Sequence, residues 1–322
     1  MSAEGSLLLL NKNHVQLLLD RKEVLGAVRE AFVLHSRAQG RVFPVIREQL
    51  AGGSIFGIKA GQVGNRGLLG FKVGGFWPAN RRAGGESHQA TMLLLDPFSG
   101  RPLCVIDGNA ITTLRTGAAG GLGLVTLARP DSTRVCVFGT GVQARIHLSF
   151  ALELMPLLRE VFYVTSNGTP NSNFERAFAA QAISHARDAD DAVANSHIVI
   201  TATPSIAPLF ALDALQDGTH INAVGADTKG KRELPAGLLE RAHLVVDDRV
   251  QARQVGEMQW LPDRSCVELG NLLSNQVEFK RESSDVTVFD MTGLALQDLM
   301  VARALQERAM ARAVGQRIEW PW

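Results

Sequence analysis

The sequence lacks paired cysteines, an excess of either charge and long apolar runs. Cys104, Cys136 and Cys266 are far apart and form no CxxC pair, which excludes a disulfide framework and a cysteine metal site and favours a reducing compartment. Lys+Arg 33 against Asp+Glu 32 leaves a net charge of +1, so no global field recruits nucleic acid or an acidic membrane. The run Leu7–Leu10 is too short for a signal-peptide core, and no stretch approaches the ~20 residues that span a bilayer. We expect a cytoplasmic protein with neither nucleic acid nor membrane as a partner and with no metal site.

What is present is ordinary globular composition: 322 residues, 46% hydrophobic and 20% charged, enough chain for about two domains. Asp20 and Glu23 have capping-box spacing before an apolar helical face, which predicts a helix near 20–36. Glycine-separated β-like runs follow, and a helix is expected over about 110–127. The predicted strands are Val42–Arg47, Ser54–Ala60, Leu68–Gly74, Gln89–Leu95 and Pro102–Asp107, with Asp96–Gly100 as a hairpin connection.

The second half of the chain alternates strands and helices. Arg134–Phe138 is a continuous apolar run, typical of a strand that is buried on both faces. Further short strands are predicted at Val161–Val164, His197–Thr201, His220–Val224 and Leu244–Val246. This rhythm predicts an α/β fold with a mostly parallel sheet. The tail, 294–314, is helical by pattern.

A glycine turn, Gly139-x-Gly141-x-x-Ala144, follows a predicted strand and opens a helix, as a dinucleotide fingerprint requires. Glycines let the backbone approach a pyrophosphate whose charge sits at the helix N-terminus, although tight strand–helix turns use glycine anyway. The end of the next strand, Thr165–Gly168, offers neither the acid that binds an NAD ribose nor an arginine for the phosphate of NADP. The choice between NAD and NADP stays open, with a slight preference for NAD.

One stretch is charged with a single sign. Residues 49–85 contain five cations, at positions 59, 66, 72, 81 and 82, and no carboxylate, and Arg47 and Arg115 flank it. Arginine and lysine bind carboxylates, so the stretch indicates an anion site; a solvated basic face is the alternative, and we favour it for every cation of the stretch except Lys72. Lys72 stands between Phe71 and Val73 in a half-buried strand, where a lysine without a function is costly.

A third signal is the loop that follows a predicted parallel strand at residues 225–231. Open α/β sheets bind ligands at that edge, so Asp227 is a candidate proton donor or acceptor, or else a turn cap. His88 and His220 stand near strand ends, where core or turn packing is expected. Asp290 and Asp298 flank Thr292-Gly293, and we interpret them mainly as helix caps.

Together these features resemble the ornithine cyclodeaminase/μ-crystallin family over nearly the whole chain, and most of all its iminosuccinate reductase branch. The matching stretches are Phe43-Pro44-x-x-Arg47, Gly70-Phe71-Lys72, Leu95-Asp96-Pro97-x-x-Gly100, Thr112-Thr113-Leu114-Arg115-Thr116-Gly117-Ala118-Ala119, Gly139-x-Gly141-x-Gln143-Ala144, Thr201-Ala202-Thr203-Pro204-Ser205, Gly225-Ala226-Asp227-Thr228-Lys229-Gly230-Lys231-x-Glu233-Leu234 and Gly256-Glu257. The resemblance implies a Rossmann-type doubly wound parallel sheet (128–299) and an α+β substrate-binding and dimerisation domain (1–127 with 300–322).

The resemblance also implies site residues. Substrate carboxylates would bind Arg47, Lys72 and Arg115, with His88 beside them, and Asp227 and Lys72 would be catalytic. Cofactor contacts are expected from Arg115, Thr116, Gly139, Gly141, Val142, Gln143, Ser166, Asn167, Thr203 and Lys231. Ornithine-specific members carry a glutamate between the first arginine and the lysine, but residues 49–71 contain no acid, which argues against ornithine as the substrate.

The resemblance implies a homodimeric NAD(P)H-dependent oxidoreductase. The leading hypothesis is reduction of a small α-imino acid to an L-amino acid, with iminosuccinate and L-aspartate as the best candidates. The alternatives are a ketimine or cyclic-imine reductase, an alanine dehydrogenase, an ornithine cyclodeaminase, and a non-catalytic μ-crystallin-like binder of NADP and a small ligand.

Overall fold

The computed structural model describes residues 5–320 and divides into two compact units. Residues up to 115, together with those from 294 onward, form unit 1, and residues 116–293 form unit 2. The sequence places the boundaries at 127/128 and 299/300 instead. The difference arises because one helix, α3 (Gly108–Leu127), continues through the first boundary, and because α10 (Ala295–Arg312) belongs wholly to unit 1.

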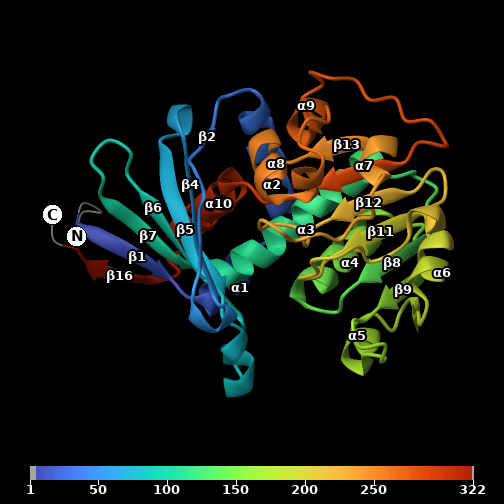
Figure 1. Ribbon diagram of the computed structural model, residues 1–322. Helices are drawn as coiled ribbons and strands as arrows, with labels where there is room; N and C mark the ends of the chain where they lie inside the picture. The colour runs from blue at the N-terminus through green and yellow to red at the C-terminus, as the bar shows by residue number, and fades with distance from the viewer. Residues whose placement is uncertain (1–4, 321–322) are drawn as a thin grey trace. The chain divides into compact units, whose positions relative to one another are not determined.

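Unit 1 is a mixed sheet with helices, in the α+β arrangement expected. Its strand order is β16-β1-β7-β6-β5-β4-β2, with β3 also paired to β4 (Figure 1). Besides α3 and α10, its elements are β1 (Ser6–Leu10), α1 (Lys12–Leu18), α2 (Arg21–Ser36), β2 (Arg41–Val42), β3 (Ile46–Gln49), β4 (Ile55–Val63), β5 (Leu68–Phe76), β6 (His88–Leu95), β7 (Pro102–Asp107) and β16 (Gln316–Glu319). Most neighbouring strands run antiparallel, whereas β1 and β7 are parallel.

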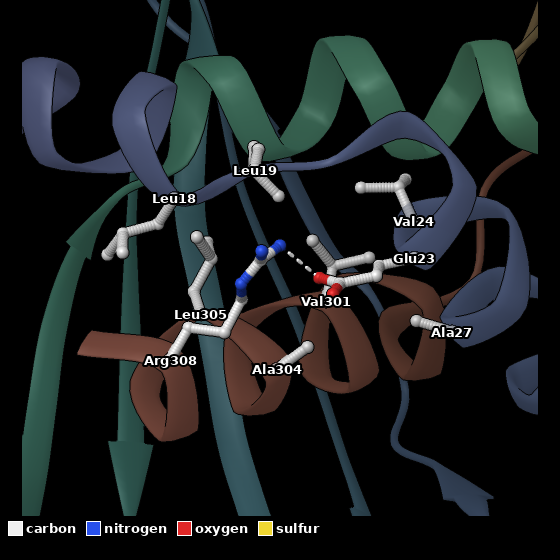
Figure 2. A pocket seen from close by; sticks show the side chains of 9 residues that line it. All are labelled: Leu18, Leu19, Glu23, Val24, Ala27, Val301, Ala304, Leu305 and Arg308. Carbon is white, nitrogen blue, oxygen red and sulfur yellow. Dashed lines mark hydrogen bonds and ion pairs between the residues drawn. The ribbon is translucent and has the colours of Figure 1, made fainter. Parts of the chain in front are cut away.

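One face of this sheet is covered by α10, which packs on β4, β5 and β6 (Figure 1). Gly61 and Gly70 make the close approach possible, because a Cβ at either position would contact Leu296 or Leu299 of α10. The helix α2 begins after Asp20, whose side chain accepts a hydrogen bond from the Glu23 backbone, as the capping spacing predicts. Figure 2 shows α2 against α10, with an ion pair joining Glu23 and Arg308 above an apolar pocket.

Two details of unit 1 differ from the sequence prediction. The single strand expected at 42–47 is two strands, β2 and β3, separated by a segment that contains Pro44, which has no N–H to donate to a ladder. The leucines near the N-terminus form β1, which pairs with β16 near the other end of the chain. The strands β1 and β16 depend on each other although they are distant in sequence, and a local sequence pattern does not reveal such a pairing.

Unit 2 is a parallel eight-stranded sheet in the order β10-β9-β8-β11-β12-β15-β13-β14 (Figure 1). Its elements are β8 (Arg134–Phe138), α4 (Val142–Leu154), β9 (Glu160–Val164), α5 (Ser172–Ala177), β10 (Ala182–His185), α6 (Ala189–Ala194), β11 (Ile198–Thr201), β12 (His220–Ala223), α7 (Leu238–Arg241), β13 (His243–Val246), α8 (Arg249–Val255), β14 (Val267–Glu268), α9 (Leu269–Leu273) and β15 (Thr287–Asp290). The doubly wound α/β prediction is confirmed.

The central strands of unit 2 are buried on both faces. Val135 and Val137 of β8 belong to one hydrophobic cluster, whereas Cys136 and Phe138 belong to another. Because successive strand residues point to opposite faces, each face has its own core. The chain continues from β8 to β9 on one side, and β11 lies on the other side of β8, which makes the carboxyl ends of β8 and β11 a topological switch point.

Within residues 5–320 no helix combines the length and the apolar character needed to cross a membrane.

Candidate functional site

The site residues predicted in unit 1 form a cluster that we call the cation cluster: Arg47, Lys59, Lys72 and Arg115, gathered around Asp298. Lys72 Nζ donates to Asp298 Oδ1 at 2.8 Å and to Thr112 Oγ1 at 3.1 Å. Arg115 Nε donates to the same Asp298 oxygen at 3.1 Å. Lys72, Arg115 and Asp298 are 7%, 6% and 1% exposed, so this three-way ion pair is desolvated.

Burial and charge act in opposite directions on Lys72. Burial disfavours the ammonium and lowers the pKa of Lys72 to about 8; the carboxylate of Asp298 raises the pKa, and the positive charges of Arg115 and Arg47 lower it. For Asp298, burial alone would raise the pKa, but Arg115 and Lys72 together hold it below its usual range. The cluster therefore contains one firmly ionised acid and a lysine that can lose its proton near neutral pH.

Two further cations share the face of Lys72. Lys59 on β4 stands directly opposite Lys72 on β5, and Arg47 on β3 stands opposite Gly57. Residues two apart on a strand share a face, so Arg47, Lys59 and Lys72 all lie on one side of the sheet. The charge of Lys59 also helps to lower the pKa of Asp298. The expectation that Lys59 belongs to a solvated surface is therefore wrong, since the register places it beside Lys72.

Two other cations of the one-signed stretch, Arg66 and Arg82, do not join this cluster. Arg66 is exposed and pairs with Glu30, and Arg82 is exposed. The side chain of Arg81 lies outside the described part of the chain. Among the cations whose side chains the structure describes, Lys59 and Lys72 thus belong to the cluster, whereas Arg66 and Arg82 lie at the surface.

His88 stands at the start of β6, where the residue is open to solvent while its ring is partly screened by its neighbours. Its Nδ1 lies 3.2 Å from Asn109 Oδ1, while Asn109 Nδ2 donates to Glu86 and to the His88 carbonyl. The amide orientation makes Nδ1 the donor, so the neutral ring presents Nε2 as an acceptor. Desolvation and the positive charges of Lys72 and Arg115 lower the pKa of His88, which favours that neutral ring. His220, by contrast, is a core residue, bonded to Thr287 and Asn222.

The site residues predicted in unit 2 follow the carboxyl ends of neighbouring strands. Gly139 follows β8, Thr203 follows β11, Asp227 follows β12, and Ser166 with Asn167 follows β9. In a parallel sheet these ends meet at one edge. The structure therefore brings these residues to the edge where such folds bind dinucleotides.

The glycine turn fits a dinucleotide. Gly139 has φ +96°, which favours glycine, and a Cβ there would lie 2.9 Å from the Ala202 carbonyl. A Cβ at Gly141 would meet nothing within 4 Å, so this position has open space where a pyrophosphate could approach. Gly141 is also the N-cap of α4, and it supplies no side-chain cap to the first turn, which leaves the positive end of the helix facing that space.

The remaining expected cofactor residues surround this turn. Val142, in the first turn of α4, is 59% exposed, and Gln143 beside it has a buried Oε1 with no hydrogen bond among the described residues. Ser166 and Asn167 are exposed, and Asn167 closes its own turn by accepting from the Thr169 backbone. Thr116, buried on α3, is the first residue of unit 2.

Asp227 is held by its own loop. Lys231 Nζ donates to Asp227 Oδ1 at 2.8 Å and to the Gly225 carbonyl at 3.1 Å, and Thr228 Oγ1 donates to the same aspartate oxygen. The side chains of Asp227 and Lys231 are 33% and 22% exposed. An ammonium at this distance favours the charged carboxylate.

Sequence reasoning missed a set of buried carboxyl groups in unit 2. Glu233 accepts hydrogen bonds from Thr201 Oγ1, from the backbone and hydroxyl of Thr203, and from the Gly225 backbone, all at 2.7 Å. It thereby joins the ends of β11 and β12. Glu257 accepts from the Glu233 backbone, which ties in the segment after α8. The glutamates stand in the quoted Gly225–Leu234 and Gly256-Glu257 motifs, which was the available signal.

The expectation that Asp290 and Asp298 are helix caps is wrong. The N-cap of α10 is Leu294, without a side-chain hydrogen bond. Asp298, inside the first turn, binds the cations of unit 1, and Asp290 at the end of β15 accepts from the Met258 backbone. Both carboxyl groups are buried, which spacing to a helix start does not reveal.

A doubly wound dinucleotide-type sheet and a second unit with a buried cation cluster define a class of two-domain oxidoreductases. A family profile for the ornithine cyclodeaminase/mu-crystallin family matches residues 7–313, and the chain belongs to this family. Its curated relatives include an alanine dehydrogenase of Archaeoglobus fulgidus, 31% identical over 97% of this chain and 98% of the relative. They also include an iminosuccinate reductase of Paracoccus denitrificans, 30% identical over 94% and 99%.

Solved structures of oxidoreductases also resemble this chain. An archaeal alanine dehydrogenase dimer with bound NAD superposes with a TM-score of 0.91 at 30% identity, over 98% of this chain and 100% of that one. The iminosuccinate reductase of Paracoccus denitrificans in complex with NAD⁺ gives 0.89 at 29%, over 98% and 99%. A Thermococcus litoralis Δ1-pyrroline-2-carboxylate reductase with NADH and L-proline gives 0.88 at 26%, over 97% and 100%. These neighbours are oxidoreductases that share both units of this chain.

Proposed function

We propose that this chain is an NAD(P)H-dependent reductase that converts a small α-imino dicarboxylic acid, best represented by iminosuccinate, to an L-amino acid. The observation that carries the proposal is the cation cluster. Four cations face one carboxylate there, which leaves room for more than one added negative charge. The named relatives support reduction at an imino or amino carbon as the reaction class.

The cluster supplies the substrate clamp. Arg47, Lys72 and Arg115 would bind the substrate carboxylates, with the arginines offering forked donors and Lys72 a point charge. Lys59, opposite Lys72, adds a further cation to the cluster and favours a second carboxylate. A distal ammonium would meet like charge there, so a diamino acid fits poorly. His88, with Nε2 as an acceptor, would bind a protonated group of the substrate.

Asp227 is the proposed partner of the substrate nitrogen. Because Lys231 favours its charged form, the carboxylate accepts a hydrogen bond from an iminium N–H and stabilises the cation that accepts a hydride. Lys72, with its pKa of about 8, is the candidate in the cation cluster for moving a proton near neutral pH.

A nicotinamide cofactor bound at the glycine turn would supply the hydride. Gly139, Gly141, Val142 and Gln143 would hold its pyrophosphate, Ser166 and Asn167 its ribose, and Arg115, Thr116, Thr203 and Lys231 are further proposed contacts. The absence of an acid or arginine at the β9 turn leaves both NAD and NADP possible, and the NAD-bound relatives favour NAD. Gly141→Val tests the assignment. Because a Cβ there meets nothing, the variant should fold and lose NADH fluorescence enhancement; normal binding would refute it.

We also propose a homodimer that uses the face of the unit 1 sheet opposite α10. Phe71, Leu93 and Val105 form one cross-strand row on that face, and Ile58 pairs with Val73 in the next. All five are only partly buried, whereas Met92 and Leu94, which flank Leu93, and Cys104 and Ile106, which flank Val105, are buried. An apolar sheet face of this kind indicates a protein interface, and one relative is a dimer. Phe71→Asp should yield monomers in light scattering coupled to gel filtration.

The substrate test measures NADH and NADPH oxidation with a series of oxo acids plus ammonium. Oxaloacetate with ammonium, a source of iminosuccinate, should give the highest kcat/KM, and pyruvate with ammonium should be at least about tenfold poorer, since a lost carboxylate contact in a desolvated site costs ~2–5 kcal/mol. L-Ornithine should yield no proline.

The matched variant is Lys59→Gln, which removes one cation and keeps a polar side chain that is shorter by one atom. This variant should lower kcat/KM with oxaloacetate more than kcat/KM with pyruvate, so the ratio of the two values should move towards one. A ratio near one in the wild-type enzyme, or proline formed from ornithine, would overturn the dicarboxylate assignment. Higher activity with pyruvate or with Δ1-pyrroline-2-carboxylate would assign the chain to the monocarboxylate reductases.

A further inference from the structure

We propose that Asp298 is a positioning residue: it orients the Lys72 ammonium and the Arg115 guanidinium for the substrate, and it determines the pH range in which Lys72 is charged. The inference rests on the proposed function for the part that concerns the substrate. None of the family motifs quoted from the sequence contains Asp298, and the residue is not expected to touch the substrate itself.

The geometry of Asp298 supports this role. One oxygen, Oδ1, accepts from both Lys72 Nζ and Arg115 Nε, so a single atom fixes the distance between two cations that would otherwise repel. Arg115 is held in addition by Gln297, whose Oε1 accepts from its Nη1 at 3.1 Å. The pair Gln297–Asp298 on α10 therefore orients the guanidinium from two sides.

The other carboxylate oxygen of Asp298, Oδ2, argues against a role in capping a helix or binding the backbone. Oδ2 is buried and makes no hydrogen bond among the described residues. An oxygen without a donor does not cap a helix or bind a backbone, so the carboxylate's described hydrogen bonds are those to the two cations. The helix packing of α10 does not require the charge, because its apolar residues, such as Leu296 and Leu299, fill the space over Gly61 and Gly70.

Without Asp298, the charged groups found to act on Lys72 would all be positive. The groups whose charges interact with Lys72 or Asp298 are Arg47 on β3, Lys59 on β4, His88 on β6 and Arg115 on α3. All of them are cations or become cations on protonation, and Asp298 is the acid among them. Removing its charge leaves burial and the repulsion of these cations to oppose the ammonium without an attracting carboxylate, so Lys72 should lose its proton at a lower pH.

Asp298→Asn is the variant of choice. The amide oxygen can keep both hydrogen bonds, and the amide nitrogen occupies the place of Oδ2, where no hydrogen bond is lost. The matched control is Thr112→Val, which removes the other hydrogen bond of the Lys72 ammonium and leaves every charge in place.

The experiment is the pH profile of kcat/KM with oxaloacetate, ammonium and NADH. Asp298→Asn should move the alkaline limb to lower pH by about one unit or more, while Thr112→Val lowers activity at every pH and leaves the limb in place. With the anion gone, KM for Asp298→Asn should stay near the wild-type value at about pH 6 and rise by roughly tenfold or more at about pH 8.5. A role confined to packing predicts a KM change independent of pH.

A second measurement does not depend on turnover. Heteronuclear NMR of the full-length protein with labelled lysines, assigned with Lys72→Arg, reports the protonation of Lys72 directly. A lower titration midpoint in Asp298→Asn than in Thr112→Val supports the proposal; equal midpoints overturn it. Suppose that the wild-type protein reduces no imino acid, while the titration midpoint of Lys72 is still lower in Asp298→Asn than in Thr112→Val. In that case the proposed function fails, and the inference that Asp298 controls the protonation of Lys72 stands.

Discussion

Both units of this protein bury carboxyl groups, and Asp298 of unit 1 behaves in the opposite way to Glu257 and Asp290 of unit 2. In unit 1, Asp298 is surrounded by cations, and its pKa lies below the usual range. In unit 2, Glu257 and Asp290 have no cation among their described hydrogen-bond partners; burial raises their pKa values to about 8 and about 7, and repulsion from neighbouring carboxylates adds to both shifts. Burial alone drives an acid towards its neutral form, and a buried cation reverses the outcome.

The difference separates two uses of a buried acid. The carboxylate of unit 1 pairs with two of the cations that we propose bind the substrate, so the cation cluster keeps an excess of positive charge. The carboxyl groups of unit 2 accept from backbone and hydroxyl donors and so connect loops at the end of the sheet. Variants in unit 1 should therefore change activity most, and variants in unit 2 should change stability most.

The largest expected effect is on activity in unit 1. Arg115→Met removes the guanidinium and leaves Asp298 paired with Lys72 alone, so kcat/KM for the imino acid should fall by roughly 10²–10³-fold, corresponding to the ~3–5 kcal/mol typical of breaking a buried ion pair. Steady-state kinetics measures this. The control is Arg66→Met, an exposed cation of the same stretch, which should remain within about twofold of wild type. Activity of Arg115→Met within tenfold of wild type would place Arg115 outside the site.

The next effect is on stability in unit 2. Glu233→Gln keeps the side-chain shape but places an amide NH₂ against donors, because the carboxylate accepts four hydrogen bonds. The free energy of unfolding should fall by about 3 kcal/mol, the cost of unsatisfied buried donors, as measured by urea denaturation. Glu240→Gln, an exposed substitution on α7, is the control. An unchanged unfolding midpoint for Glu233→Gln would mean that the loops are held by other contacts.

The smallest effect concerns pH. The folded pKa values of Glu257 and Asp290 lie above those of the unfolded chain, so both groups favour folding while protonated. That contribution is present at acidic pH and is lost as pH rises through about 7 and about 8. Glu257→Gln combined with Asp290→Asn cannot ionise and should flatten the pH dependence of unfolding between about pH 6 and pH 8.5. A slope equal to that of wild type would show that both groups are ionised throughout.

The parallel sheet could be predicted from sequence because its strands are buried on both faces. Such strands appear as continuous apolar runs, as in Val135–Phe138 and Ile198–Thr201, and a local pattern suffices to find them. The glycine turn was predictable for the same reason: its strand, turn and helix are consecutive in the chain. The residues at the edge of unit 2 were therefore placed on the correct strands.

The carboxylate of the cation cluster was not predictable, because its partners are distant in sequence. Asp298 binds Lys72 across 226 positions, and in its own segment it is indistinguishable from an acid that favours a helix start. Lys59 was missed because its position beside Lys72 depends on the register of the β4–β5 hairpin, and a one-residue slip would send it to the other face. The single sign of the charges identified the stretch, but it could not show which of its cations belong to the cation cluster and which lie at the surface.

The pairing of β1 with β16 sets an order for folding during synthesis. Unit 2 is one continuous segment, so the ribosome releases it whole and it can fold as a unit. Unit 1 cannot complete its sheet until residues 316–319 have been made, and until α10 emerges the cations at positions 72 and 115 have no aspartate between them. The nascent chain therefore carries its charged strands uncovered for most of translation, and the proposed substrate site becomes complete only with the last elements of the fold.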